Sequence, residues 1–172
     1  MNQETITAPG GPIVVTGHFR TLFPTTAHGA HTARRAAERW LAAQQERPEA
    51  STGDDSEATV SLLIAELTAN AARHARVRGR NARLSLTLTP ATLRIEVTDA
   101  RGDRLFVPAA PDTDTVDESG RGLLLVTTLA DAWGCEPHHP GGKTVWAEYL
   151  RRECAAEGRA KTTVHPPAGV GG

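Results

Sequence analysis

Hydrophobic and polar side chains alternate along two neighbouring stretches of the chain, residues 82–89 and 92–99. Leu84, Leu86 and Leu88 alternate with polar residues in the first stretch, and the second repeats the pattern with leucine, isoleucine and valine. A period of two is expected of strands that bury one face of a sheet and leave the other face to solvent. Because a proline stands between the two stretches, we expect them to form a hairpin.

Two helices are predicted before this hairpin. The first covers residues 28–45, which are rich in the strong helix formers Ala, Arg, Glu and Leu. The second begins at Asp54 or Asp55, where acidic side chains suit the positive end of the helix dipole, and extends to about Ala75. Spacings of three and four place these residues of the first helix on one packing face: Ala33, Ala36, Ala37, Trp40 and Leu41.

The second helix carries two polar residues beside its apolar stripe. Glu66 and Asn70 are one turn apart and therefore face the same side of the helix. At ~100° per residue they fall on the edge of the stripe, neither deep in the core nor on the far solvent face. The wall of a pocket is the natural place for such a pair. The stripe itself consists of Val60, Leu63, Ile64, Leu67 and Ala71.

The complete pattern predicts a two-layer α+β sandwich, in which helices cover one face of a mixed, mainly antiparallel sheet. Strands that follow one another through short turns favour antiparallel pairing, and the helices then cover one face. A long loop with several prolines, residues 100–120, separates the hairpin from the third helix. The remaining predicted elements are a first strand at 13–20, a helix at 121–132 and strands at 133–139 and 143–151.

Composition limits the domain count and the classes of partner. The 172 residues suffice for one core, which we assign to residues 13–150, between a flexible arm at 1–12 and a disordered tail at 151–172. The net charge of −1 gives no broad attraction to nucleic acid or to an anionic membrane. Because no apolar run approaches 18 residues and the first residues lack a signal-peptide pattern, we expect a cytoplasmic protein that contacts neither membrane nor nucleic acid directly.

Four motifs follow one another in the chain, and their order is more specific than any one of them. They are "ELTANAARHA" at 66–75, "VTDARG" at 97–102, "SGRGLLLV" at 119–126 and "GGKTVW" at 141–146. Together they resemble the Bergerat-fold ATP-binding domain of histidine kinases, gyrase, mismatch-repair ATPases and a heat-shock chaperone. Within that superfamily the chain is most similar to the stand-alone anti-sigma-factor serine/threonine kinases of actinomycetes, over about residues 13–150.

The resemblance implies a site for ATP and Mg²⁺. Asn70 matches the residue that holds Mg²⁺ against the triphosphate, which agrees with the preference of this cation for oxygen ligands. Glu66 matches the general base that acts on the attacking hydroxyl group. Asp99 matches the acceptor of the adenine amino group. Gly120 and Gly122, directly before the predicted third helix, match the residues that bring backbone N–H groups close to phosphate.

Three further residues belong to the implied nucleotide site, and two other residues in the motifs depart from the family pattern. Gly102 and Leu123 lie within the matching motifs, and Thr144 matches the position that supports the adenine end. The superfamily's first glycine box reads Asp-x-Gly-x-Gly, but Arg101 and Asp103 stand here at the two glycine positions. Glycine permits positive φ and close approach of a ligand to the backbone, and neither replacement does so equally well.

The resemblance therefore implies a regulatory kinase that transfers the γ-phosphate of ATP to a partner antagonist protein, and that binds a sigma factor, the antagonist, or both. A non-catalytic module with a degenerate nucleotide site, which acts by protein contact alone, is the alternative. A histidine-kinase catalytic domain is a third reading, with less support because no helix with a phosphoacceptor histidine precedes the motifs. Homodimer formation is left open.

Overall fold

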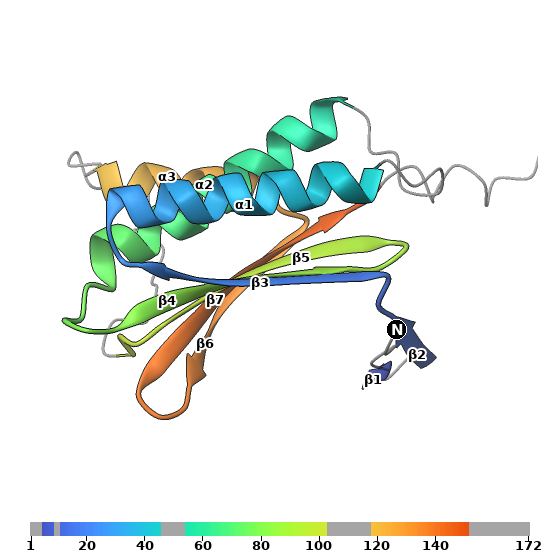
Figure 1. The fold of residues 1–172 in the computed structure, drawn as a ribbon. Coiled ribbons are helices and arrows are strands. Elements are labelled where there is room, and N and C mark those ends of the chain that lie inside the picture. Colours follow the sequence, from blue (N-terminus) through green and yellow to red (C-terminus); the bar gives the residue numbers. More distant parts are fainter. Residues whose placement is uncertain (1–4, 9–10, 46–53, 103–117, 152–172) are drawn as a thin grey trace, which may run out of the picture.

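A computed structural model describes residues 5–8, 11–45, 54–102 and 118–151 of the chain (Figure 1). The predicted tail lies outside these ranges except for Arg151, as do residues 103–117 of the predicted long loop and Asp103 of the glycine box. The described elements, in chain order, are β1 (Thr5–Ala8), β2 (Gly11–Val14), β3 (Gly17–Pro24), α1 (Ala27–Gln45), α2 (Asp54–His74), β4 (Asn81–Leu88), β5 (Thr92–Asp99), α3 (Glu118–Leu129), β6 (Ala132–His138) and β7 (Gly142–Leu150).

Five of the strands form one sheet, and the helices cover one of its faces (Figure 1). The strand order is β3-β4-β5-β7-β6, and every neighbouring pair among these strands is antiparallel. This arrangement confirms the predicted two-layer α+β fold, and the pairing is more uniform than the mixed sheet that we expected. The register of β5 with β7 places Asp99 opposite Lys143 and Thr98 opposite Thr144.

The core lies between α2 and the middle of the sheet. The alternating residues of β4 and β5 point toward the helices, and Leu84, Leu86 and Ile95 have no exposed surface. The stripe predicted on α2 is confirmed, because each of its five members is buried. In α1, Ala33 and Ala37 are buried, and Trp40 and Leu41 pack against the same core.

The opposite face of the sheet is polar, as the alternation requires. Arg94 of β5 donates to Glu148 of β7 at 2.7 Å and to Glu96 at 3.1 Å, and its guanidinium lies 4.1 Å from the ring centroid of Trp146. Burial lowers the pKa of Arg94, but the two carboxylates outweigh burial, and the pKa of Arg94 is raised. Arg94 therefore keeps its charge at any accessible pH.

The N-terminal region differs from the prediction of one strand at 13–20. β2 ends at Val14, where it pairs with β1 in a separate two-stranded sheet, and β3 continues to Pro24. Pro24 lacks an N–H group, yet it is tolerated because it ends a strand at the edge of the sheet. Residues 5–8 and 11–12 of the predicted arm belong to the β1–β2 hairpin.

The third helix also differs from the prediction. α3 begins at Glu118 instead of residue 121, so both Gly120 and Gly122 lie inside its first two turns. Among the helices that the structure describes, none is long and apolar enough to cross a membrane.

Candidate functional site

The polar edge of α2 lies where the prediction put it. Glu66 and Asn70 are both half-buried, whereas Leu67 and Ala71, the residues that follow them, are 2% exposed. Burial of the stripe against the sheet fixes the rotation of α2, and this rotation presents the carboxylate and the carboxamide at the border of the core. The two side chains are therefore accessible and also held by a rigid element.

Gly122 brings the first turns of α3 against the carboxylate of Glu66. A Cβ atom at Gly122 would collide with Oε2 of Glu66, so only glycine allows the two helices to stand this close with the carboxylate in place. The first four N–H groups of a helix have no partner within the helix. Gly120 lies within this set, two residues before Gly122, and N–H groups of this kind can donate to an anion.

A second close approach joins the end of β5 to the turn between β6 and β7. A Cβ atom at Gly142 would overlap the carbonyl oxygen of Asp99, and one at Gly102 would lie 2.8 Å from the carbonyl oxygen of Gly142. The N–H of Gly102 donates to the carbonyl of Gly141 at 3.0 Å. Gly141 has φ of +91°, a conformation that favours glycine. These glycines hold the two backbones together beside Asp99.

Lys143 is the residue of this region that the motifs did not predict. Its Nζ lies 3.0 Å from Oδ2 and 3.2 Å from Oδ1 of Asp99, and the side chains of both residues are 3% exposed. Strand alternation explains the contact, because Lys143 shares the helix-facing side of β7 with the buried Val145 and Ala147. The same alternation in the sequence predicts that Lys143 lies on the buried side of this strand, whereas the motif points to the neighbouring Thr144.

Thr144 faces the other way. Its hydroxyl group lies 3.0 Å from that of Thr98, and Thr98 in turn accepts a hydrogen bond from Nη2 of Arg83 at 3.2 Å. The hydroxyl of Thr144 therefore bonds on the outer face of the sheet, and Lys143 is the β7 side chain that reaches Asp99.

Arg101, at the first departure from the glycine box, links the end of β5 to the end of α2. Its N–H donates to Oδ1 of Asp99 at 2.8 Å, and its Nη1 lies 3.5 Å from the carbonyl of His74 at the end of α2. No residue other than glycine in the described part of the chain has a positive φ, so Arg101 causes no backbone strain. The loop thereby joins the Asp99 end of the sheet to the turn of α2 that follows Asn70.

The phosphate side of the expected site, at Glu66 and Asn70, fits ATP and Mg²⁺ better than the adenine side, at Asp99. Glu66 and Asn70 are oxygen-bearing side chains, and Glu66 lies beside the first turns of a helix, a combination suited to Mg²⁺ and phosphate. Asp99 is buried at the expected strand end, but its carboxylate already binds an ammonium group. The side chain of Leu123 lies outside the described part of the structure.

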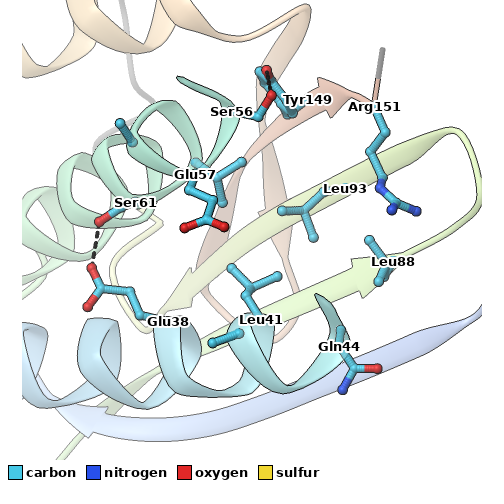
Figure 2. A pocket seen from close by; sticks show the side chains of 13 residues that line it. Glu38, Leu41, Gln44, Ser56, Glu57, Ser61, Leu88, Leu93, Tyr149 and Arg151 are labelled. Carbon is cyan, nitrogen blue, oxygen red and sulfur yellow. Dashed lines mark hydrogen bonds between the residues drawn. The ribbon is translucent and has the colours of Figure 1, made fainter. Parts of the chain in front are cut away.

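A separate cavity of about 450 Å³ lies at the other end of the sheet (Figure 2). It opens between the C-terminal half of α1 and the first turns of α2, and Figure 2 shows Leu41, Leu88 and Leu93 among its lining side chains. Leu93 is the second residue of the strand that Asp99 ends, so about 20 Å of extended chain separates the two at 3.3 Å per residue. None of the predicted site residues lines this cavity.

The antiparallel sheet covered by helices on one face is an α+β fold consistent with an ATPase domain. The sequence comparison agrees: the family model for the histidine kinase-like ATPase domain matches residues 23–149, and the chain belongs to this family. A search among curated proteins found no match. Membership supports a regulatory role that involves ATP binding.

Proposed function

We propose that the chain is a regulatory serine/threonine protein kinase of the anti-sigma-factor type, which transfers the γ-phosphate of ATP to a partner protein. The observation that carries this proposal is the contact between Glu66 and Gly122. It puts a half-buried carboxylate beside the N-terminal turns of α3, where phosphate is favoured. A carboxylate in that position is suited to receive the proton of a hydroxyl group that attacks phosphate.

Each remaining site residue has one task in this proposal. Asn70 would supply an oxygen ligand to Mg²⁺, and the bound cation would neutralise the charge of the phosphates. The N–H groups around Gly120 bind phosphate, and Asp99 accepts a hydrogen bond from the adenine amino group. In the transfer, the hydroxyl oxygen of a partner serine or threonine bonds to the γ-phosphorus, its proton passes to Glu66, and ADP leaves.

The partner is a protein that carries the serine or threonine. We infer that it is a small antagonist protein, and that a sigma factor is bound by the same kinase. Both assignments rest on the resemblance of the four motifs to the stand-alone kinases. The target is therefore best identified by capture from the native organism followed by phosphorylation of the captured protein.

The test is transfer from labelled ATP to such a partner, measured beside calorimetric binding of ATP·Mg²⁺. Glu66→Gln keeps the size and polarity of the side chain but removes the base, so binding should stay within a few-fold of wild type. The transfer rate should fall by about 10²–10⁴-fold, the usual contribution of a general base. Transfer at the wild-type rate by Glu66→Gln would show that Glu66 is not the base.

A non-catalytic binding module is the second candidate, and the pairing of Asp99 with Lys143 favours it. In that function the fold is kept, the nucleotide site is weak, and regulation occurs through protein contact alone. The two functions differ in thermal unfolding: the kinase should be stabilised by ATP, and more so with Mg²⁺. A binding module would unfold at the same temperature without nucleotide, with ATP, and with ATP and Mg²⁺.

A further inference from the structure

The ammonium group of Lys143 is held entirely by the protein. An ammonium group has three N–H donors and no acceptor. Lys143 has three acceptors within hydrogen-bond distance: Oδ1 of Asp99 at 3.2 Å, Oδ2 of Asp99 at 3.0 Å and the carbonyl oxygen of Arg101 at 2.8 Å. All of its donor capacity is therefore spent inside a site from which water is excluded.

The carboxylate of Asp99 is correspondingly occupied. Oδ1 accepts from the N–H of Arg101 at 2.8 Å as well as from Lys143, and Oδ2 accepts from Lys143. An adenine amino group that approaches Asp99 is also a donor, and it meets the ammonium beside the same two oxygens. Hydrogen bonds to a charged acceptor are about twice as strong as neutral ones, so a carboxylate neutralised by a bound cation is the weaker partner for adenine.

We propose that Lys143 sets the nucleotide affinity of the site by competing with the adenine amino group for the carboxylate of Asp99. This inference rests on the proposed ATP site. Without nucleotide, Lys143 pairs with Asp99 and donates to the carbonyl oxygen of Arg101. When ATP binds, the adenine amino group takes over one oxygen of Asp99, and the ammonium group has to give up part of its contact.

The decisive variant is Lys143→Met, which keeps an unbranched side chain but removes the charge and the donors. It leaves Asp99 buried without its cation, so the protein without nucleotide should unfold at a lower temperature. The adenine amino group then becomes the missing donor, so the dissociation constants of ATP and of adenosine should both fall about tenfold or more. Lys143→Gln, which keeps a neutral donor, should give a smaller gain and serves if Lys143→Met does not fold.

Binding of adenosine tests the adenine part of the site, and binding of inorganic tripolyphosphate tests the phosphate part separately. Competition at Asp99 predicts tighter adenosine binding in Lys143→Met and tripolyphosphate binding that is unchanged or slightly weaker. If Lys143 binds phosphate instead, the variant should lose affinity for both ATP and tripolyphosphate. If Lys143 only supports the fold, its unfolding temperature should fall with no change in any dissociation constant. Either of these two outcomes overturns the proposal.

Arg94→Met is the matched control. It also removes a cation from an ion pair on β5 and β7, 2.7 Å from Glu148, but on the outer face of the sheet. Its unfolding temperature should fall while its affinity for adenosine stays at the wild-type value. If wild type binds ATP and Lys143→Met binds adenosine no tighter, the inference fails and the proposed function stands. If neither protein binds ATP or adenosine, the proposed function fails, and the inference fails with it.

Discussion

Replacement of Gly122 by alanine separates the chemistry of the site from the stability of the fold. Alanine in the interior of a helix is favoured over glycine by about 1 kcal/mol, so α3 itself should become more stable. The new methyl group, however, occupies the place of Oε2 of Glu66. Because the obstacle is the end of a flexible side chain and not backbone, the carboxylate should turn aside by about 1 Å, and a shift of this size can reduce a catalysed rate by about 10²-fold.

The expected result is an unfolding temperature equal to or up to about 4 °C above that of wild type, since 1 kcal/mol corresponds to a few degrees in a domain of this size. Binding of ATP·Mg²⁺ should change by less than about threefold, and phosphate transfer to the partner should fall by about 10²-fold. Thr128→Ala is the control, because it raises helix propensity on an exposed part of α3 without touching Glu66. Wild-type transfer by Gly122→Ala would refute the role of this contact in catalysis.

Three further substitutions test other parts of the site. Asn70→Ala should weaken binding of ATP with Mg²⁺ at least tenfold while binding without Mg²⁺ changes little, and calorimetry with and without the metal measures this difference. Asp99→Asn should lower the free energy of unfolding in urea by about 3–5 kcal/mol, because it leaves the ammonium of Lys143 buried without its charge partner, and Asp99→Asn combined with Lys143→Met should recover most of the loss. Gly142→Ala should cost about 1–3 kcal/mol in the same urea experiment, since its Cβ meets the carbonyl of Asp99.

The loss of stability expected for Asp99→Asn limits a simpler experiment. Asp99→Asn alone is the obvious test of adenine recognition, with an expected loss of about 1–3 kcal/mol of binding free energy for a hydrogen bond to a charged group. Because the same substitution also unbalances a buried ion pair, any loss of ATP binding has to be compared with the loss of folded protein. Asp99→Asn introduced together with Lys143→Met removes this ambiguity, because no buried ammonium group is then left without its charge partner.

The helices and strands with periodic hydrophobic residues could be predicted, because the spacing of those residues shows which side of each element is buried. The stripe on α2 and the alternation in β4 and β5 required no knowledge of the partners, only that one side of each element is covered. The edge position of Glu66 and Asn70 followed from the same stripe. The end of the first strand of the main sheet was not predicted, because Pro24 breaks the strand pattern in the sequence yet ends β3 on an edge where a missing N–H group does no harm.

The contacts between elements could not be predicted in this way. That Gly122 admits the carboxylate of Glu66 depends on how closely α3 packs on α2, and no local pattern contains that distance. Lys143 was missed for a different reason. Its position on the buried side of β7 follows from the alternation with Val145, but a lysine is seldom fully buried without a partner, and the partner became known only from the register of β7 with β5.

The central claim is that the chain binds ATP between α2, α3 and the Asp99 end of the sheet. Isothermal titration of the wild-type protein with ATP, with and without Mg²⁺, and with GTP tests it most directly. We predict one ATP bound per chain, tighter binding with Mg²⁺, and no binding of GTP, because the carbonyl that guanine carries in place of the adenine amino group offers no donor to Asp99. Absence of ATP binding under both conditions, or equal affinity for ATP and GTP, would contradict the account.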